Sequence, residues 1–338
     1  MEYRRMGCTG LKVSQLCLGT MTFGHSADED ESRRMVDMAI DVGINFFDTA
    51  NSYAASRSEQ FLGNIIKGRR RDHVIATKFF NPMGPGPNDS GMSRVNIMNA
   101  VEDSLRRLQT DWIDVYYIHH VDTQTPVEEM LRAQDDLVRQ GKVRYTACSN
   151  YPAWRLMEAI GIAERHGWAR FDCYQPQYSL VVRDIEQELI PLCQHKGLGV
   201  VVWAPMAGGF LTGKYTPGER TAAGTRSEEG WAYPSAYFAD NADDTLMTLI
   251  QVSESVGHSP AQVAVAWVVE QPGITSAIVG SRTAQQLADT LGSATWRLPQ
   301  EASEQLSRVS HLPHRYPEAM QANMHERRDD AVGTMDKL

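Results

Sequence analysis

Four polar residues stand where short apolar runs of the chain end. Asp48 closes the run FFD, Tyr53 follows five positions later, Lys78 closes VIATK, and His119 follows DVYYI. The separations from Asp48 to Lys78 and from Lys78 to His119 are 30 and 41 positions, each close to one strand and one helix. A carboxylate, a phenol, an ammonium and an imidazole that converge can deliver a proton to a carbonyl oxygen and stabilise charge there.

Each of the four side chains has a separate task in such a reaction. A tyrosine hydroxyl has a pKa of about 10, so it needs a neighbour that favours the phenolate. The ammonium of Lys78 is expected to lower the pKa of Tyr53, and the carboxylate of Asp48 to compensate the buried lysine charge. His119 can donate a hydrogen bond that orients the substrate oxygen. Singly these residues have ordinary structural explanations, and it is their joint occurrence that indicates catalysis.

The elements that must position these residues are short apolar runs alternating with amphipathic stretches. The runs are rich in β-branched and aromatic residues, as is typical of buried parallel strands. We predict strands at Gln15–Leu18, Asn45–Asp48, His73–Lys78, Ile113–Ile118, Val143–Ala147, Cys173–Gln175, Gly199–Trp203 and Ser276–Val279. We predict helices at Asp30–Val42, Ser93–Leu108, Val127–Gln140, Pro152–His166 and Asp184–Lys196, several with N-terminal signals or glycine stops.

Strand followed by helix about eight times predicts an α/β fold, a (β/α)8 TIM barrel with its active site at the C-terminal face of the strands. A single domain is expected over 1–338, because no linker or composition shift divides the chain. Asn81–Gly91 and Ala204–Tyr237 are long loops after strand ends, where barrel loops carry function. Met1–Gly10 is expected to form a small hairpin that plugs the opposite end.

Composition disfavours several classes of partner. The net charge is −9 and no block of like charges reaches five residues, so neither nucleic acid nor an anionic membrane is expected to bind. Five cysteines without a CxxC pair indicate reduced thiols and a cytoplasmic protein. The N-terminus lacks the apolar region of a signal peptide, and no window resembles a membrane span.

Several motifs, taken in chain order, resemble the aldo-keto reductase family over nearly the full length of the chain. They are GTMTFG (19–24), GINFFDTANSYAASRSEQFLG (43–63), VIATK (74–78), SLRRLQTDWIDVYYIHHVD (104–122), ACSN (147–150), YQPQYS (174–179), WAPMAGGFLTGKY (203–215) and SPAQVAVAWVVEQPGITSAIVGSRTAQQL (259–287). The 91–108 region and YQPQYSL resemble the aryl-alcohol-dehydrogenase-like branch, which is related to potassium-channel β subunits. The resemblance implies NADP-dependent, reversible reduction of an aldehyde or ketone, with Asp48, Tyr53, Lys78 and His119 catalytic and Tyr53 the proton donor.

The resemblance also implies a cofactor site. Ser149, Asn150 and Gln175 are expected to hold the nicotinamide carboxamide, Trp203 to stack on its ring, and the loop after Trp203, with Lys214, to wrap the pyrophosphate. The complete expected set is Gly19, Thr20, Met21, Asp48, Ser149, Asn150, Gln175, Trp203, Ala204, Pro205, Met206, Ala207, Gly208, Lys214, Gly280, Ser281, Arg282, Gln286 and Asp289.

Two features bear on which dinucleotide binds. The guanidinium fork of Arg282 suits a 2′-phosphate, which favours NADP (NADPH) over NAD. Asp289 and Thr290 stand where the family commonly has Glu and Asn near the adenine, so contact there is in doubt. No GxGxxG opens a helix after the first strand, which argues against a Rossmann dehydrogenase.

The substrate is expected to be a small carbonyl compound that touches Tyr53, Phe79, His119 and His120. His120 replaces the more usual Trp or Met, and either contacts substrate or fills the loop. The expected pocket wall comprises Met21, Phe23, Tyr53, Phe79, Phe80, His120, Tyr178, Trp231 and Tyr233. Its aromatic character fits many carbonyl compounds equally, so the substrate, the working direction and the oligomeric state, monomer or homo-oligomer, stay open.

Two other functions compete with the reductase. A nicotinamide-binding sensor or partner protein of the channel-β-subunit type keeps the same barrel, but here the catalytic histidine position is intact at His119. A metal-dependent hydrolase using His119 and His120 is disfavoured, because adjacent side chains at a strand end diverge and neither HxH nor HExxH occurs. No metal is therefore expected.

Overall fold

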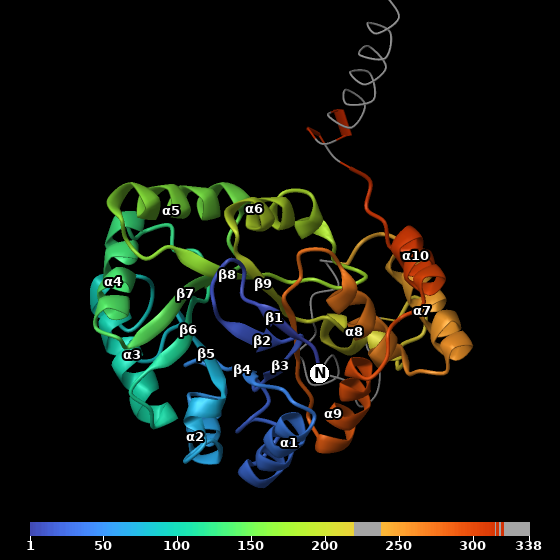
Figure 1. Ribbon diagram of the computed structural model, residues 1–338, viewed down its shortest axis with the longest axis horizontal. Helices are drawn as coiled ribbons and strands as arrows, with labels where there is room; N and C mark the ends of the chain where they lie inside the picture. Colours follow the sequence, from blue (N-terminus) through green and yellow to red (C-terminus); the bar gives the residue numbers. More distant parts are fainter. Residues whose placement is uncertain (220–237, 315, 318, 321–338) are drawn as a thin grey trace, which may run out of the picture.

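A closed barrel of eight parallel strands forms the centre of the computed structural model, which describes residues 1–219, 238–314, 316–317 and 319–320 (Figure 1). The barrel strands are β3 (Leu16–Gly19), β4 (Phe46–Asp48), β5 (Val74–Phe79), β6 (Ile113–Ile118), β7 (Val143–Ser149), β8 (Phe171–Gln175), β9 (Gly199–Val202) and β10 (Ser276–Val279). Each strand pairs with its sequence neighbour, and β10 closes the ring against β3. The predicted (β/α)8 barrel is confirmed, and each predicted strand overlaps an observed one.

Helices surround the barrel, and all but the last described one follow the chain order, as parallel strands require of their crossovers (Figure 1). Those described are α1 (Glu29–Asp41), α2 (Arg57–Ile65), α3 (Arg94–Leu108), α4 (Val127–Arg139), α5 (Ala153–His166), α6 (Leu189–Lys196), α7 (Ala242–Val256), α8 (Pro260–Glu270), α9 (Ala284–Leu291) and α10 (Gln300–Val309). α7 and α10 pack on each other at one side of the ring.

Local signals in the sequence set several helix ends. Ser93 caps α3, with its side chain accepting a hydrogen bond from the backbone N–H of Asn96. Gly167 and Gly197 end α5 and α6 in the left-handed conformation, at φ 63° and 68°, which glycine adopts without steric cost. These predicted ends are confirmed, but the helix predicted from Asp184 is divided into a 3-10 turn at Asp184–Glu186 and α6, which begins at Leu189.

Alternation along the strands divides the apolar residues between two layers. One layer, inside the barrel, includes Cys17, Phe46, Val115, Tyr117 and Val201. The other lies between the barrel and its helices and contains the strand residues that point outward. A side chain at a strand end therefore faces either the barrel axis or the helix layer, and its position in the alternation decides which.

A hairpin closes the end of the barrel where the strands begin. β1 (Tyr3–Arg5) pairs antiparallel with β2 (Lys12–Ser14), so the expected hairpin extends beyond Gly10. Met6 is fully buried among the residues inside the barrel. The contact is tight, since a Cβ added at Gly199 would lie 2.4 Å from the Met6 sulfur. The hairpin thus fills the strand-start end of the barrel.

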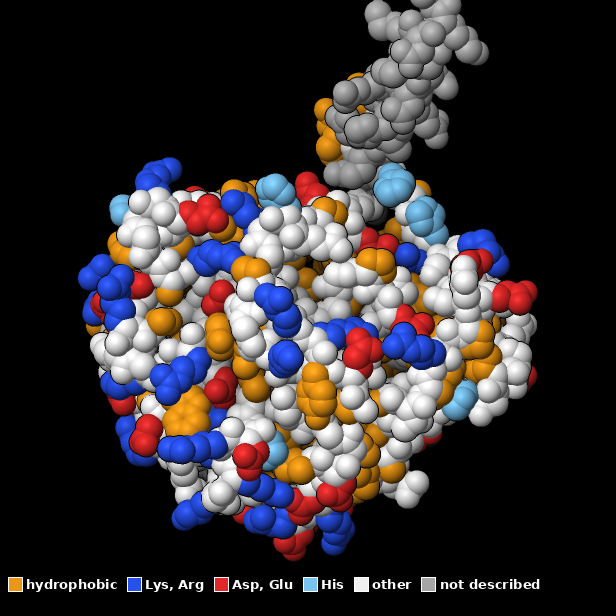
Figure 2. Space-filling model, in the orientation of Figure 1, with side chains coloured by type: hydrophobic (Ala, Val, Ile, Leu, Met, Phe, Trp, Pro, Cys, Tyr) orange, Lys and Arg blue, Asp and Glu red, His pale blue; other side chains and the backbone are white. Residues whose placement is uncertain are grey.

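Charged side chains are spread over the face that Figure 2 shows, with lysine and arginine interspersed among aspartate and glutamate. No helix among the described residues is both long and apolar enough to cross a membrane. The expected pocket residues Trp231 and Tyr233, in the loop after β9, lie outside the described residues.

Candidate active site

A cavity of about 860 Å³ lies at the C-terminal ends of the barrel strands. Its walls come from the loops after β3, β4, β6, β7, β8, β9 and β10, together with α8 and α9. Its lining residues are Gly19, Met21, Thr22, Asp48, Tyr53, His119, His120, Ser149, Asn150, Gln175, Trp203, Ala204, Pro205, Met206, Gly208, Gly209, Thr212, Lys214, Ala261, Ile278, Gly280, Ser281, Arg282, Gln285, Gln286, Asp289 and Thr290.

The four residues expected to be catalytic converge at the floor of this cavity. The Nζ atom of Lys78 donates hydrogen bonds to Asp48 Oδ1, to the Thr49 carbonyl oxygen at 2.8 Å, and to the Tyr53 hydroxyl at 3.1 Å. The side chains of Lys78 and Asp48 are 1% and 3% exposed. The His119 ring lies edge-on to the Tyr53 ring, with centroids 5.9 Å apart. These four side chains therefore lie together, as their spacing in the sequence predicts.

The buried environment sets the protonation of these groups. Burial lowers the pKa of Lys78, but the Asp48 carboxylate and the Tyr53 phenol raise it by more, so the ammonium form persists. Burial raises the pKa of Tyr53 by more than the Lys78 charge lowers it. The expected effect of Lys78, which lowers the pKa of Tyr53, is therefore present, but burial outweighs it. Burial, with the Lys78 charge and His120 adding to it, lowers the pKa of His119 to about 2, so this imidazole is neutral.

Tyr53 is held by an unusual turn between β4 and α2. Ala54, Ala55 and Ser56 all have positive φ, at 50°, 52° and 73°. Residues with a Cβ seldom adopt this conformation, and runs of it cost free energy that the surrounding structure must supply. The turn is anchored by hydrogen bonds from the Ser56 hydroxyl to the Asn51 carbonyl, at 2.9 Å, and from the Asn51 N–H to the Lys78 carbonyl, at 3.0 Å.

Hydrogen bonds of amide and indole groups surround the four residues expected to be catalytic, which we call the tetrad. Gln175 Nε2 donates to Asp48 Oδ2 at 2.8 Å, which fixes the orientation of that amide. Asn150 donates to the His119 carbonyl oxygen at 3.1 Å and accepts from Trp203 Nε1 at 3.1 Å. Three of the residues expected at the nicotinamide, Gln175, Asn150 and Trp203, are thus oriented around the catalytic groups and line the cavity.

The far part of the cavity suits a long, polar ligand. Gly208 and Gly209 have positive φ, at 67° and 108°, so the backbone there turns without a side chain over the cavity. At Gly280 a Cβ would lie 3.1 Å from the Gly19 carbonyl oxygen, so the space beside two strand ends depends on glycine. Lys214 and Arg282 add positive charge to the same wall. Backbone amides, glycines and cations together fit a dinucleotide phosphate chain.

Asp289 lies at the cavity wall but its carboxylate is already used within the protein. Its Oδ2 accepts a hydrogen bond from Ser259 Oγ at 2.8 Å, and its Oδ1 accepts one from Gln262 Nε2 at 3.2 Å. The side chain therefore ties α9 to the start of α8, and this competes with the expected contact to adenine.

Apart from the fully buried Lys78, three expected site residues do not line the cavity. Phe79 is fully buried and stacks on Tyr116, with centroids 4.8 Å apart, in the layer between barrel and helices. It follows Lys78 directly, so when Lys78 points inward Phe79 must point outward. Thr20 is fully buried and hydrogen-bonded to the Asp48 carbonyl, and Ala207 is 1% exposed. Phe79 is therefore not part of the cavity wall, whereas the expected contacts of Phe79 with substrate and of Thr20 and Ala207 with cofactor stay predictions.

The expected aromatic wall is also smaller than the sequence indicated. Phe23 and Tyr178 are fully buried, and Tyr178 donates to Glu186 at 2.6 Å and stacks near Trp267. Phe80 does not line the cavity but packs edge-on against His120. His120 does line the cavity, and its ring stacks on that of His119 with centroids 4.6 Å apart.

Some lining residues were absent from the sequence-based set. They are Thr22, Gly209, Thr212, Ala261, Ile278, Gln285 and Thr290. Thr22 and Gln285 are adjacent in sequence to the expected residues Met21 and Gln286, and this adjacency could have indicated them. Ala261 offers no such signal, because α8 reaches the cavity only through tertiary packing.

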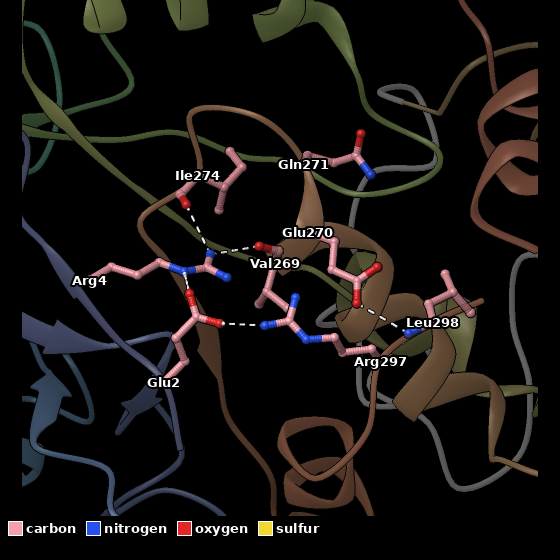
Figure 3. A pocket seen from close by; sticks show the side chains of 8 residues that line it. All are labelled: Glu2, Arg4, Val269, Glu270, Gln271, Ile274, Arg297 and Leu298. Atoms are coloured by element: carbon pink, nitrogen blue, oxygen red, sulfur yellow. Dashed lines mark hydrogen bonds and ion pairs between the residues drawn. The ribbon is translucent and has the colours of Figure 1, made fainter. Parts of the chain in front are cut away.

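A second cavity, of about 430 Å³, lies on the hairpin side of the barrel (Figure 3). Its charged side chains are bonded to one another or to the backbone: Glu2 pairs with Arg4 and Arg297, and Glu270 accepts from the Leu298 N–H. Within the described part of the chain no group of His, Cys, Asp and Glu is arranged to hold a metal ion.

The chain matches the profile of the Aldo/keto reductase family over residues 15–311. It is 40% identical over 323 residues to the "Uncharacterized oxidoreductase YrpG" of Bacillus subtilis (strain 168), covering 91% of this chain and 96% of that protein. It is 37% identical over 299 residues to a "Probable voltage-gated potassium channel subunit beta" of Oryza sativa subsp. japonica, covering 86% and 90%. A protein of the same name from Arabidopsis thaliana is 36% identical over the same length and coverage.

The fold, the converging tetrad and these matches define the class of protein. The chain belongs to the aldo/keto reductase family of oxidoreductases.

Proposed function

We propose that this protein is an NADP(H)-dependent oxidoreductase that reversibly reduces an aldehyde or ketone to an alcohol, with Tyr53 as the proton donor. The observation that carries the proposal is the Lys78 ammonium, which is hydrogen-bonded to both the Asp48 carboxylate and the Tyr53 hydroxyl at the floor of the cavity. Membership of the family supplies the broader class, oxidoreductase.

The proposed roles follow from the geometry and the charges. Tyr53 keeps its proton at neutral pH because burial raises its pKa, and it passes that proton to the carbonyl oxygen. The Lys78 ammonium, 3.1 Å away, stabilises the phenolate left behind, and Asp48 holds the ammonium in place. The neutral His119 donates a hydrogen bond to the same substrate oxygen. His120, stacked on His119, contacts the remainder of the substrate.

The cofactor site is proposed along the length of the same cavity. Ser149, Asn150, Gln175 and Trp203 would hold the nicotinamide, which supplies hydride to the carbonyl carbon. The remaining proposed contacts are Gly19, Met21, Asp48, Ala204, Pro205, Met206, Gly208, Lys214, Gly280, Ser281, Arg282, Gln286 and Asp289. We propose NADP rather than NAD because Arg282 can bind a 2′-phosphate through two parallel N–H groups.

The second candidate is a nicotinamide-binding partner protein. It is favoured by the printed names of two relatives at 37% and 36% identity, both called channel β subunits. Such a protein would keep the cavity without needing turnover. The hydrogen bonds of Lys78 to Asp48 and Tyr53 favour the enzyme, because cofactor binding alone does not require a tuned phenol.

We extend the proposal to the molecule as a whole. Residues 1–338 are proposed to form a single catalytic domain, acting in the cytoplasm on a small-molecule carbonyl compound. The described cysteines are all free thiols, and Cys17, Cys148, Cys173 and Cys193 are buried, which is compatible with a reducing compartment.

The test is NADPH absorbance decay with a panel of aldehydes and ketones, run beside NADH. We expect substrate-dependent decay in the wild type and a loss of about 10²- to 10⁴-fold in Tyr53→Phe, because the proton donor is removed. NADPH binding, measured by fluorescence quenching, should be retained in that variant. Tight NADPH binding without turnover on any carbonyl compound would favour the partner-protein function. Equal turnover in the wild type and in Tyr53→Phe would contradict the role of Tyr53.

A further inference from the structure

Asn81 lies behind the ring of His119, outside the cavity lining. Its Nδ2 atom is 3.0 Å from Ser52 Oγ and 3.5 Å from His119 Nδ1. The longer distance is near the outer limit of a hydrogen bond, and such contacts in active sites often shorten when substrate binds. Asn81 therefore joins the loop after β4 to the residue that follows β6.

The backbone holds Asn81 in this place from both sides. Phe80, just before it, has φ 149°, a value that residues with a Cβ rarely adopt. The Phe80 carbonyl accepts from the Gly91 N–H at 2.8 Å, which closes the loop, and the His119 N–H donates to the Phe79 carbonyl at 3.0 Å. The two loops that bring Asn81 and His119 together are thus fixed at their roots.

His119 has one ring proton whose location matters. The titratable groups that face it are the Lys78 ammonium, the neutral Tyr53 phenol and His120, whose ring stacks on it. These surroundings hold the imidazole neutral, so either Nδ1 or Nε2 carries the proton and only that nitrogen can donate. Nδ1 faces Asn81, which leaves Nε2 on the opposite side of a ring that lines the cavity.

We propose that Asn81 is a positioning residue that fixes the tautomer of His119. Its amide N–H donates to Nδ1, which must then be the acceptor, and so the proton resides on Nε2. Its effect on turnover rests on the proposed function, because only there does His119 need to donate to a substrate oxygen. The tautomer itself is a property of the protein without substrate.

The test reads the tautomer directly, by long-range ¹H–¹⁵N correlation spectra of the full chain, with His119→Gln used to identify the His119 signals. We expect the Nε2–H pattern in the wild type. In Asn81→Asp the carboxylate can only accept a hydrogen bond, so Nδ1 should become protonated. In Asn81→Ala the two tautomers should coexist. Asn88→Asp makes the same charge change at an exposed position in the same loop and should keep the wild-type pattern.

Steady-state kinetics provide the second measurement. Asn81→Asp should lower kcat by about 10- to 100-fold, the loss typical when a group that orients a functional imidazole is removed, with the KM for NADPH unchanged. Its pH profile should gain an inflection from the new imidazole–carboxylate pair. An Nδ1–H signal in the wild type, or an Nε2–H signal retained in both Asn81 variants, would overturn the proposal. If the wild type reduces no carbonyl compound, the proposed function fails while the spectra still decide the role of Asn81.

Discussion

Each end of the barrel carries a cavity beside a pair of opposite charges, but the two pairs differ in burial. At the hairpin end Arg4 donates to the Val269 and Ile274 carbonyls, at 2.6 and 3.1 Å, and the Glu2–Arg297 pair is 43% and 82% exposed (Figure 3). At the opposite end the Lys78–Asp48 pair is almost wholly buried, and Asp48 lines the cavity. Charges that water can screen hold loops together, whereas desolvated charges beside a cavity can act on a substrate.

Strained backbone is likewise concentrated at the cavity end of the barrel. Among the described residues, the non-glycine positions with positive φ are Ala54, Ala55, Ser56, Phe80, Gln109, Asn150, Ala204 and Ala207. All except Gln109, which ends α3, lie in loops after barrel strands at the cavity end. Strained conformations persist where the surroundings fix them, and two of these residues, Asn150 and Ala204, line the cavity. Comparable strain is not found in the hairpin.

Removing a single charge at each end of the barrel should give the largest difference in stability and turnover. Lys78→Met leaves the buried Asp48 carboxylate without its partner, so the free energy of unfolding should fall by about 3–5 kcal/mol. Turnover should fall by about 10²- to 10⁴-fold, because the phenolate of Tyr53 loses its stabilising charge. Urea unfolding and the NADPH assay measure the two effects.

The matched control is Arg297→Ala at the hairpin end. Because the side chain is 82% exposed, the change should cost no more than about 1 kcal/mol and leave turnover unaltered. Equal losses of stability in Lys78→Met and Arg297→Ala would mean that the two pairs do not differ as their burial implies.

Arg282→Ala sharpens the comparison within the cavity itself. Removal of a guanidinium that binds a 2′-phosphate costs about 1.5–3 kcal/mol, so the KM for NADPH should rise by about 10- to 100-fold. The KM for NADH, which lacks that phosphate, should change little. Titrations of both cofactors with Arg297→Ala as reference measure this, and equal losses for NADPH and NADH would show that Arg282 does not contact the phosphate.

A histidine at the strand-start end of the barrel, His73, predicts a smaller effect, on the pH dependence of stability. His73, at the start of β5, packs against Phe47 and has no hydrogen-bond partner at either ring nitrogen. Burial, aided by Arg69, lowers the pKa of His73, so the unfolded chain takes up its proton first as pH falls. Stability from neutral His73 is complete above the unfolded pKa of about 6.5 and is lost below it, by at most about 1.4 kcal/mol per pH unit.

His73→Phe should remove this part of the pH dependence and leave turnover unchanged. Urea unfolding between about pH 5 and pH 8 measures the slope, where the unfolded histidine titrates. Residual dependence belongs to other groups such as His119, whose pKa is also lowered. An unchanged slope in His73→Phe would show that His73 does not titrate differently in the two states.

Periodicity and strand-end positions made the fold and the tetrad predictable. The eight apolar runs and the spacing of Asp48, Lys78 and His119 required only that parallel strands end on the same side of the barrel. The expected place of Phe79 in the pocket wall is wrong, because a residue adjacent to an inward lysine in a strand must face outward.

Other features depended on interactions that no local pattern records. The pKa of Tyr53 is set by how completely it is buried, which outweighs the Lys78 charge. Asp289 is bonded to Ser259 and Gln262 on α8, a tertiary contact. The place of Asn81 beside His119 depends on a strained loop, and strain is invisible in the order of residues.

The plug at the strand-start end has a kinetic consequence. Met6 and the residues packed around it fill the barrel axis, so a molecule held at Tyr53 has the cavity mouth as its route in and out. Product and incoming substrate must then use the same passage, one after the other. We therefore expect escape through the mouth to limit the rate whenever the product is bulky.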